Sequence, residues 1–221
     1  MINFEMRLQP LLKQDVGLLT DLESQAFNGQ GEDVFTLRMV QEIGWVYAAM
    51  NSQLSKLLGA VEVLPARESG LGFIHGILVE PECQYHGIGA KLLTYVEKEA
   101  RENGLSCLSC TISPTNGASL NIFINKSGYY ATRFEWNYYG QNEHRLWVEK
   151  KLTTGQNNNL EQYFGELIRS ESASPDYLPV LDNDYSGLDE ALNSNGGRLI
   201  SLVRPKYSGL NNNCLIVKLK P

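Results

Sequence analysis

The sequence lacks any run of about 20 apolar residues, which is the length that a membrane-spanning helix needs. Its first ten residues, Met1 to Pro10, also lack the apolar core of a secretory signal peptide. From these two absences we expect no membrane span and a cytoplasmic location.

The sequence has four cysteines, and their spacing does not favour a zinc site. Cys107 and Cys110 form a C-x-x-C, a spacing used by redox and zinc sites, but no second Cys or His pair lies near them. They stand in the apolar run SCLSCTIS, which favours two buried strand residues. We expect no metal.

The sequence also has no excess of positive charge. It contains 19 Lys and Arg residues and 25 Asp and Glu residues, so the net charge is −6. Nucleic acids and anionic membranes are bound mainly through Lys and Arg, which argues against a nucleic-acid partner. An acidic chain suits a cationic partner such as an ammonium group.

Apolar periodicity predicts an α/β protein with antiparallel strands first and strand–helix alternation later. We expect a mixed, mostly antiparallel central sheet flanked by helices over residues 1–153. Residues 154–221 would form a small α+β extension packed on it, after a polar linker at 155–159. The expected strands are 4–10, 44–51, 56–66, 71–79, 105–113, 129–139, 144–152, 198–204 and 214–220, and the expected helices are 13–27, 33–43, 87–103, 117–127, 160–170 and 188–192.

The most informative stretch is a loop with Gly87 and Gly89 that joins a strand directly to a helix. Helix amino ends present unpaired backbone N–H groups and partial positive charge, and glycines let a bulky anion approach them. The pattern predicts a pyrophosphate cradle, although a Gly-rich turn without a ligand remains open. It is neither the dinucleotide fingerprint nor a Walker loop.

Two blocks resemble the GNAT superfamily of N-acyltransferases. Gln84, Gly87, Gly89 and Ala90 match its Q/R-x-x-G-x-G/A signature, and the block from Asn116 to Tyr129 resembles its second conserved region. The resemblance implies the GNAT fold. It also implies a donor that is acetyl-CoA, a longer acyl-CoA or an acyl carrier protein, and an amine acceptor.

The resemblance also assigns residues to the donor. Backbone amides of the loop would bind the coenzyme A pyrophosphate, and the neighbouring strand end and the second block would contact the pantetheine arm. The implied donor-binding residues are Ile77, Leu78, Val79, Gln84, Tyr85, His86, Gly87, Ile88, Gly89, Ala90, Asn116, Ser119 and Phe123.

The sequence departs from the family at the group that protonates the departing thiolate. Many relatives have a Tyr where this chain has Phe123, or Ile124 in a shifted alignment. Tyr129 is a nearby candidate acid, with a core aromatic residue as the alternative. Water or the ammonium product would otherwise supply the proton.

The general base must take a proton from an ammonium whose solution pKa is about 10. His75 is the only titratable side chain on the strand that leads to the loop, and His suits base chemistry near pH 7. We expect it to share strand parity with Phe73, Ile77 and Val79. A structural His is the alternative. Glu62 on the adjacent strand is the second candidate base, or else an exposed strand charge.

The acceptor side is predicted from Tyr138 and Tyr139, which precede a glycine hairpin. This hairpin resembles that of ribosomal-protein N-acetyltransferases, where it lines a peptide groove. Paired tyrosines are otherwise ordinary cross-strand packing. We expect a peptide or protein amine as acceptor, with a small-molecule amine or a non-catalytic acyl-CoA-binding module as alternatives, in a monomer or homodimer. His144 is expected at the surface.

Overall fold

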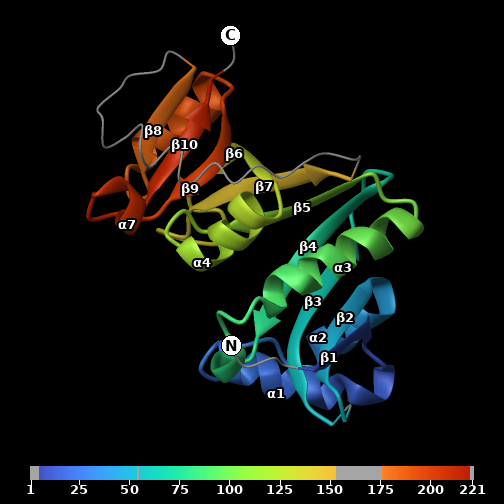
Figure 1. The fold of residues 1–221 in the computed structure, drawn as a ribbon. Helices are drawn as coiled ribbons and strands as arrows, with labels where there is room; N and C mark the ends of the chain where they lie inside the picture. The colour runs from blue at the N-terminus through green and yellow to red at the C-terminus, as the bar shows by residue number, and fades with distance from the viewer. Residues whose placement is uncertain (1–4, 54, 153–175, 220–221) are drawn as a thin grey trace. The chain divides into compact units, whose positions relative to one another are not determined.

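The computed structural model describes residues 5–53, 55–152 and 176–219, which divide into two compact units (Figure 1). Unit 1 is Met1–Leu108 and unit 2 is Ser109–Pro221. The predicted linker at 155–159 and helix at 160–170 lie outside the described residues. The predicted domain boundary between residues 153 and 154 stays a prediction.

Unit 1 is built on four strands, each antiparallel to the next in the order β1-β2-β3-β4. The strands are β1 (Met6–Pro10), β2 (Trp45–Asn51), β3 (Leu57–Pro65) and β4 (Leu71–Val79). The helices are η1 (Lys13–Asp15), α1 (Val16–Ala26), α2 (Val34–Ile43), η2 (Pro81–Cys83) and α3 (Ile88–Glu102). These elements lie within a few residues of those that the apolar periodicity predicts.

Helices cover both faces of this sheet. Ala48 of β2 packs in one buried cluster with Leu19 of α1 and Leu37 of α2. The preceding residue, Tyr47, instead meets Tyr95 of α3 edge to face, with ring centroids 5.6 Å apart. Because successive strand residues point to opposite faces, α1 and α2 cover one face and α3 covers the other. Burial of each such Leu contributes about 1.5–3 kcal/mol.

A β-bulge interrupts the pairing of β3 with β4. Glu62 is opposite Gly76, whereas Val63 is opposite Ile74, so His75 is the extra residue. The predicted alternation through His75 is therefore wrong, because a bulge shifts the faces of the residues on one side of it. The bulge decides where the His75 side chain points.

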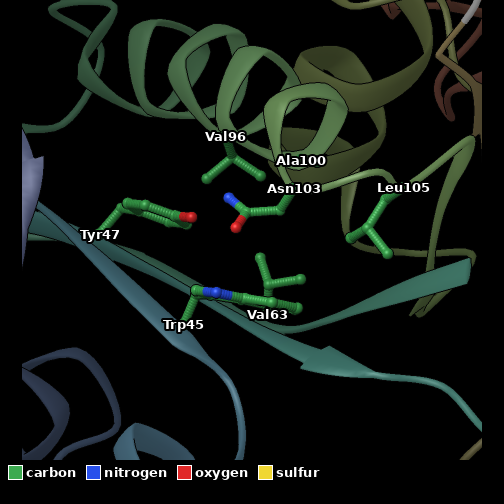
Figure 2. A pocket seen from close by; sticks show the side chains of 7 residues that line it. All are labelled: Trp45, Tyr47, Val63, Val96, Ala100, Asn103 and Leu105. Atoms are coloured by element: carbon green, nitrogen blue, oxygen red, sulfur yellow. The ribbon is translucent and has the colours of Figure 1, made fainter. Parts of the chain in front are cut away.

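Figure 2 shows a small apolar cleft under α3, lined by Trp45, Tyr47, Val63, Val96, Ala100, Asn103 and Leu105. Ala100 lies about 20 Å along the helix from Gly87, at 1.5 Å rise per residue. The cleft therefore belongs to the carboxyl end of α3, far from the glycine loop at its amino end. Within the described residues, no helix is long and apolar enough to cross a membrane.

Unit 2 continues from β5 (Cys107–Ile112), which crosses the boundary between the units. Its strands follow the order β5-β7-β6-β9-β10-β8. They are β6 (Tyr130–Glu135), β7 (Arg145–Lys151), β8 (Tyr177–Leu181), β9 (Arg198–Val203) and β10 (Cys214–Lys218). The helical segments are α4 (Gly117–Leu120), η3 (Asn121–Lys126), α6 (Tyr185–Asp189), η4 (Glu190–Ser194) and α7 (Pro205–Ser208).

Two local predictions are wrong in unit 2. Residues 177–181 form strand β8, where no strand was predicted, and Pro179 is compatible with it because β8 is the last strand at the sheet edge. Strand β6 ends at Glu135, so Tyr138 and Tyr139 lie in a turn and not on a strand. The part of the chain after residue 176 joins the sheet where Ala131 of β6 pairs with Leu199 of β9.

Candidate active site

The glycine loop lies between β4 and α3, as predicted. Gly87 caps the helix with a φ of +82°, in the left-handed region that favours glycine. Tyr85 also has a positive φ of 63° and is 95% exposed. The side-chain amide of Gln84 donates to the carbonyl oxygen of Val79 over 3.3 Å, which links the loop to the end of β4.

The amino end of α3 is held firmly against the sheet. Ile88 and Gly89 in its first turn are buried. Gly59 of β3 permits this close packing, since a Cβ there would lie 2.7 Å from the Leu78 carbonyl oxygen and 3.1 Å from Leu92. In the described chain, no side chain caps this helix end. The first-turn amides of α3 therefore retain the capacity to bind an anion.

His75 and Glu62, the two candidate bases, lie together. The His75 Nε2 atom is 3.9 Å from Glu62 Oε2 and also 3.9 Å from Glu32 Oε1. About a third of the His75 side chain is exposed (32%), whereas Glu62 is 1% exposed. A ligand from solvent therefore reaches the imidazole before it reaches Glu62.

Glu62 is a buried carboxyl without a hydrogen-bond partner among the described residues. Burial, with a smaller contribution from the charges of Glu23 and Glu32, raises its pKa to about 8. Gly76 leaves room for this carboxyl, because a Cβ at that position would lie 3.3 Å from Glu62 Oε2. The predicted alternative of an exposed strand charge is therefore wrong for Glu62.

Glu23 and Glu32 belong to the same cluster, and neither was predicted from the sequence. Glu23 of α1 is 3% exposed and accepts the backbone N–H of Glu32 over 3.2 Å. Burial is the main cause that raises the pKa of Glu23. A signal was available for Glu23, which follows Leu19 by four residues on the buried face of α1. Glu32 stands in the polar connection between α1 and α2, where no periodicity marks it.

The predicted donor residues of unit 2 lie around its first helix. Asn116 caps α4, and its side-chain oxygen accepts the backbone N–H of Ser119 over 3.0 Å. Phe123 is 2% exposed and packs edge to face on Tyr129, which is 1% exposed, with centroids 5.0 Å apart. The Lys150 ammonium lies 5.6 Å from the centroid of the Tyr129 ring. Both aromatic rings are therefore part of the core of unit 2.

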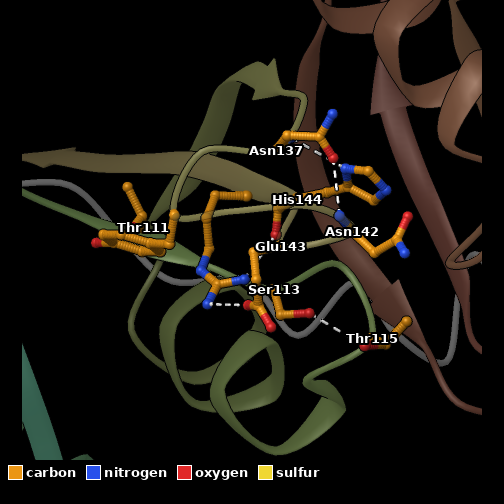
Figure 3. Close-up of polar contacts among 9 residues, drawn as sticks. Thr111, Ser113, Thr115, Asn137, Asn142, Glu143 and His144 are labelled. Atoms are coloured by element: carbon orange, nitrogen blue, oxygen red, sulfur yellow. Dashed lines mark hydrogen bonds and ion pairs between the residues drawn. The ribbon is translucent and has the colours of Figure 1, made fainter.

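Tyr138 and Tyr139 form an exposed aromatic pair, with ring centroids 4.7 Å apart. The Tyr139 hydroxyl lies 3.0 Å from the Thr111 hydroxyl of β5, and the Arg145 guanidinium stacks over its ring at 4.8 Å. Figure 3 shows Thr111 beside the polar contacts of this turn. Tyr139 is fixed by these two contacts, and it supports Tyr138 in turn.

His144 is 7% exposed, so the prediction of a surface position is wrong. Its Nδ1 atom accepts the backbone N–H of Asn137 over 3.2 Å, which closes the turn (Figure 3). Its ring packs against Trp136 and against Tyr185 of α6, with centroids 4.9 Å and 4.6 Å away. Trp136 in addition donates its indole N–H to Asp189 over 3.0 Å. These contacts bury His144 between the turn and α6.

A family profile matches sequence in both units of the chain. The profile of the acetyltransferase (GNAT) family matches residues 18–129, which is half of the chain. The protein therefore belongs to the GNAT acetyltransferase family. The comparison with curated protein sequences gave no match.

Solved structures support the fold. The ribosomal-protein-S18-alanine N-acetyltransferase from Escherichia coli aligns with a TM-score of 0.59 at 17% identity, over 69% of this chain and 97% of that one. An aminoglycoside 6'-N-acetyltransferase complexed with coenzyme A aligns with a TM-score of 0.57 at 16% identity, over 68% and 99%. A ribosomal-protein-alanine N-acetyltransferase from Brucella melitensis gives 0.57 at 18%, over 66% and 99%. The predicted fold, a mixed sheet flanked by helices, is confirmed.

Proposed function

We propose that this protein is an N-acetyltransferase that moves an acyl group from acetyl-CoA, or from a longer acyl-CoA, to an amine. One observation carries the proposal beyond family membership. Strand β4 carries His75 next to the buried Glu62, and the same strand leads through the glycine loop to the amino end of α3, which no side chain of a described residue caps. A proton acceptor and an anion cradle therefore lie on one continuous piece of backbone.

The donor would bind with its pyrophosphate at the first turn of α3. The amides of Ile88, Gly89 and Ala90 have no side-chain cap among the described residues, and the helix dipole favours negative charge there. The edge of β4 at Ile77 to Val79, with Asn116 and Ser119 in the second block, would contact the pantetheine arm, as in the family that the chain resembles.

The acyl transfer balances with the groups of this chain. His75 would take one proton from the acceptor ammonium, and the free amine would then attack the thioester carbon. A C–N bond forms, the C–S bond breaks, and the second amine proton passes to the thiolate sulfur. Tyr129 is the alternative source of that last proton. The burial of Tyr129 favours the amine as the source of this proton, because a core hydroxyl does not reach solvent or substrate without rearrangement.

Glu62 would serve His75 by offsetting the charge of the imidazolium. Its pKa of about 8 means that it becomes a carboxylate in the range where α-amino groups of peptides also lose their protons, at about 8. The 3.9 Å separation exceeds a hydrogen bond, and such contacts often shorten when substrate binds.

We propose a peptide or protein amine as acceptor, with Tyr138 and Tyr139 lining its path, and a small-molecule amine as the second candidate. Intact-mass analysis of peptides and amines incubated with a series of acyl-CoA donors tests the activity. Acylated product with equal release of coenzyme A is the expected result. Coenzyme A binding without transfer to any acceptor would instead identify a non-catalytic acyl-CoA-binding module.

The donor assignment has a test of its own in Gly89→Val. The added side chain blocks the approach of a pyrophosphate to the first turn of α3, so donor affinity should fall at least about tenfold, or 1.4 kcal/mol. Gly17→Val is a matched control, since Gly17 is also the second residue of its helix and has open space around it. Equal donor affinity in both variants, each shown to be folded by circular dichroism, would refute the cradle.

A further inference from the structure

We call the carboxyl groups of Glu23, Glu32 and Glu62 the acidic subsite. Those of Glu32 and Glu62 each have an oxygen 3.9 Å from His75 Nε2, and Glu23 binds the backbone N–H of Glu32. The three carboxyl groups come from α1, from the connection between α1 and α2, and from β3. The backbone N–H of Glu32 is bound by Glu23, and the Glu32 carboxylate in turn lies 3.9 Å from His75. The connection is therefore held in the position that brings its carboxylate to the candidate base.

Glu62 gives the acidic subsite an unsatisfied acceptor. Neither of its oxygens has a hydrogen-bond partner in the described chain, although the side chain is 1% exposed. Burial of a carboxyl without a partner costs free energy, and the nearby carboxyls Glu23 and Glu32 increase that cost. A cationic ligand would relieve both effects.

The cations on adjoining elements are engaged elsewhere. Lys13, which precedes α1, pairs with Glu42 of α2 at 2.6 Å. Arg38 of α2 donates to the backbone carbonyl oxygen of Lys13. Both contacts are made at exposed side chains. Among the described residues, His75 is the basic group within ion-pair distance of Glu32 and Glu62.

We propose that the acidic subsite binds a second positive charge on the acceptor, so that the acceptor is a dication with another amine or guanidinium close to the reacting amine. This inference rests on the proposed acyl transfer. The reacting ammonium must become neutral before it attacks, and from then on it no longer offsets the carboxylates. A second cation that stays charged holds the acceptor through the reaction.

The same charge balance favours turnover. Acylation converts one ammonium into a neutral amide, so the product carries one positive charge less than the substrate. Electrostatic attraction to Glu32 and Glu62 is weaker for the product, which therefore leaves more easily. The acidic subsite thus distinguishes substrate from product without any movement of the fold.

Two matched pairs of acceptors test the proposal. One pair is 1,4-diaminobutane and butylamine, and the other is a peptide with Lys at its second position and the same peptide with norleucine there. In at least one pair, kcat/KM should be at least about tenfold higher for the dication, equal to 1.4 kcal/mol. The pair that shows the preference identifies the acceptor as a small polyamine or as a basic peptide.

Glu32→Gln should reduce this preference to about threefold or less, since it removes the exposed carboxylate of the acidic subsite. Glu42→Gln is the matched control, because it removes a carboxylate from α2 that pairs with Lys13. It should leave the preference for the dication as in the wild type. A ratio near one in the wild type, or an undiminished ratio in Glu32→Gln, would overturn the proposal.

Calorimetric binding of 1,4-diaminobutane in the presence of coenzyme A separates this proposal from the acyl transfer itself. Binding that Glu32→Gln weakens, without turnover of any acceptor, would support the acidic subsite and refute the enzyme. Turnover of monocations and dications at equal rates would support the enzyme and refute the acidic subsite. Binding at pH 7 should also release protons, because a cation favours the ionised form of Glu62, and Glu62→Gln should abolish that release.

Discussion

Unit 1 and unit 2 each hold a polar side chain against their strands, one buried and one half-buried, and the two differ in their hydrogen bonds. In unit 1, Glu62 is 1% exposed and neither oxygen accepts a hydrogen bond from a described residue. In unit 2, the Asn125 amide donates to the Leu202 carbonyl oxygen over 2.8 Å and accepts the Leu202 N–H over 2.9 Å. The Ser201 hydroxyl adds a third bond over 3.3 Å.

Asn125 stabilises the fold, whereas Glu62 reduces its stability. The half-buried Asn125 amide, whose hydrogen bonds are satisfied, contributes to stability, and its loss leaves backbone groups of β9 without that partner. An unsatisfied buried carboxyl costs free energy in the folded state and gives nothing in return. The position of Glu62 beside His75 supplies a chemical reason for this cost, whereas Asn125 attaches η3 to β9.

Glu62→Gln should give the largest effect on activity. Above pH 8 the ionised Glu62 offsets the imidazolium, so the variant should lose about 100-fold in kcat, a typical loss for acid–base groups. Below pH 7 the wild-type carboxyl is itself protonated and resembles the amide, so the two rates should converge. Rate profiles from pH 6 to 9 measure this, with Glu42→Gln as the control.

The same variant should be more stable than the wild type. The folded pKa of Glu62 is raised above its unfolded value of 4.5. Between these two values the unfolded state releases a proton that the folded state keeps. Wild-type stability therefore falls by about 1.4 kcal/mol per pH unit from this group as pH rises from 4.5 to about 8, and then stays level. Urea unfolding at pH 5 and 8 should show that the difference in unfolding free energy between Glu62→Gln and the wild type is larger at pH 8. An unchanged difference would contradict the burial of Glu62.

Asn125→Ala should give the opposite result, with lower stability and unchanged chemistry. It leaves the N–H and carbonyl of Leu202 unpaired on that side, and the expected loss is about 2–3 kcal/mol. The kcat of the folded fraction should match the wild type. Asn103→Ala is the matched control, since its exposed amide donates to the backbone carbonyl oxygen of Glu99 in its own helix. Equal losses of stability in the two variants would show that the partial burial of the Asn125 hydrogen bonds does not matter.

Much of the fold was predictable from the sequence, and the predictions that are wrong have physical causes. The elements of unit 1 follow from apolar periodicity, and the glycine loop follows from Gly87 and Gly89 at a strand–helix junction. The bulge at His75 was not predictable, because one extra residue leaves the local composition of the strand unchanged. Strand β8 was missed because Pro179 and its acidic neighbours resemble a loop, which an edge strand tolerates.

The candidate site was predictable only as a list of separate residues. His75 and Glu62 were both identified, but their contact depends on the register of β3 against β4. Glu32 was not identified, because its role comes from the fold of a connection that Glu23 holds by one backbone hydrogen bond. His144 was placed at the surface because the aromatic residues that bury it, such as Tyr185, lie far away in the sequence.

The smallest expected effect concerns the exposed contact between Tyr139 and Thr111 in unit 2. Exposed hydrogen bonds stabilise little, so Tyr139→Phe and Thr111→Val should each cost about 0.5–1 kcal/mol or less. If the aromatic pair lines the acceptor path, as proposed, and this contact fixes it, each variant should raise the acceptor KM about two- to fivefold, within the same free-energy range. The donor KM and kcat should not change.

The double variant decides whether the two hydroxyls act as one contact. Either substitution alone breaks the same bond, so the combined rise in acceptor KM should equal that of one variant and not the product of both. Steady-state kinetics of the four proteins, with the preferred acceptor varied at saturating acetyl-CoA, gives the coupling directly. Multiplicative effects would mean that Tyr139 and Thr111 influence the acceptor independently. No effect in any variant would remove the Tyr138 and Tyr139 turn from the acceptor path and leave acceptor recognition to the carboxylates around His75.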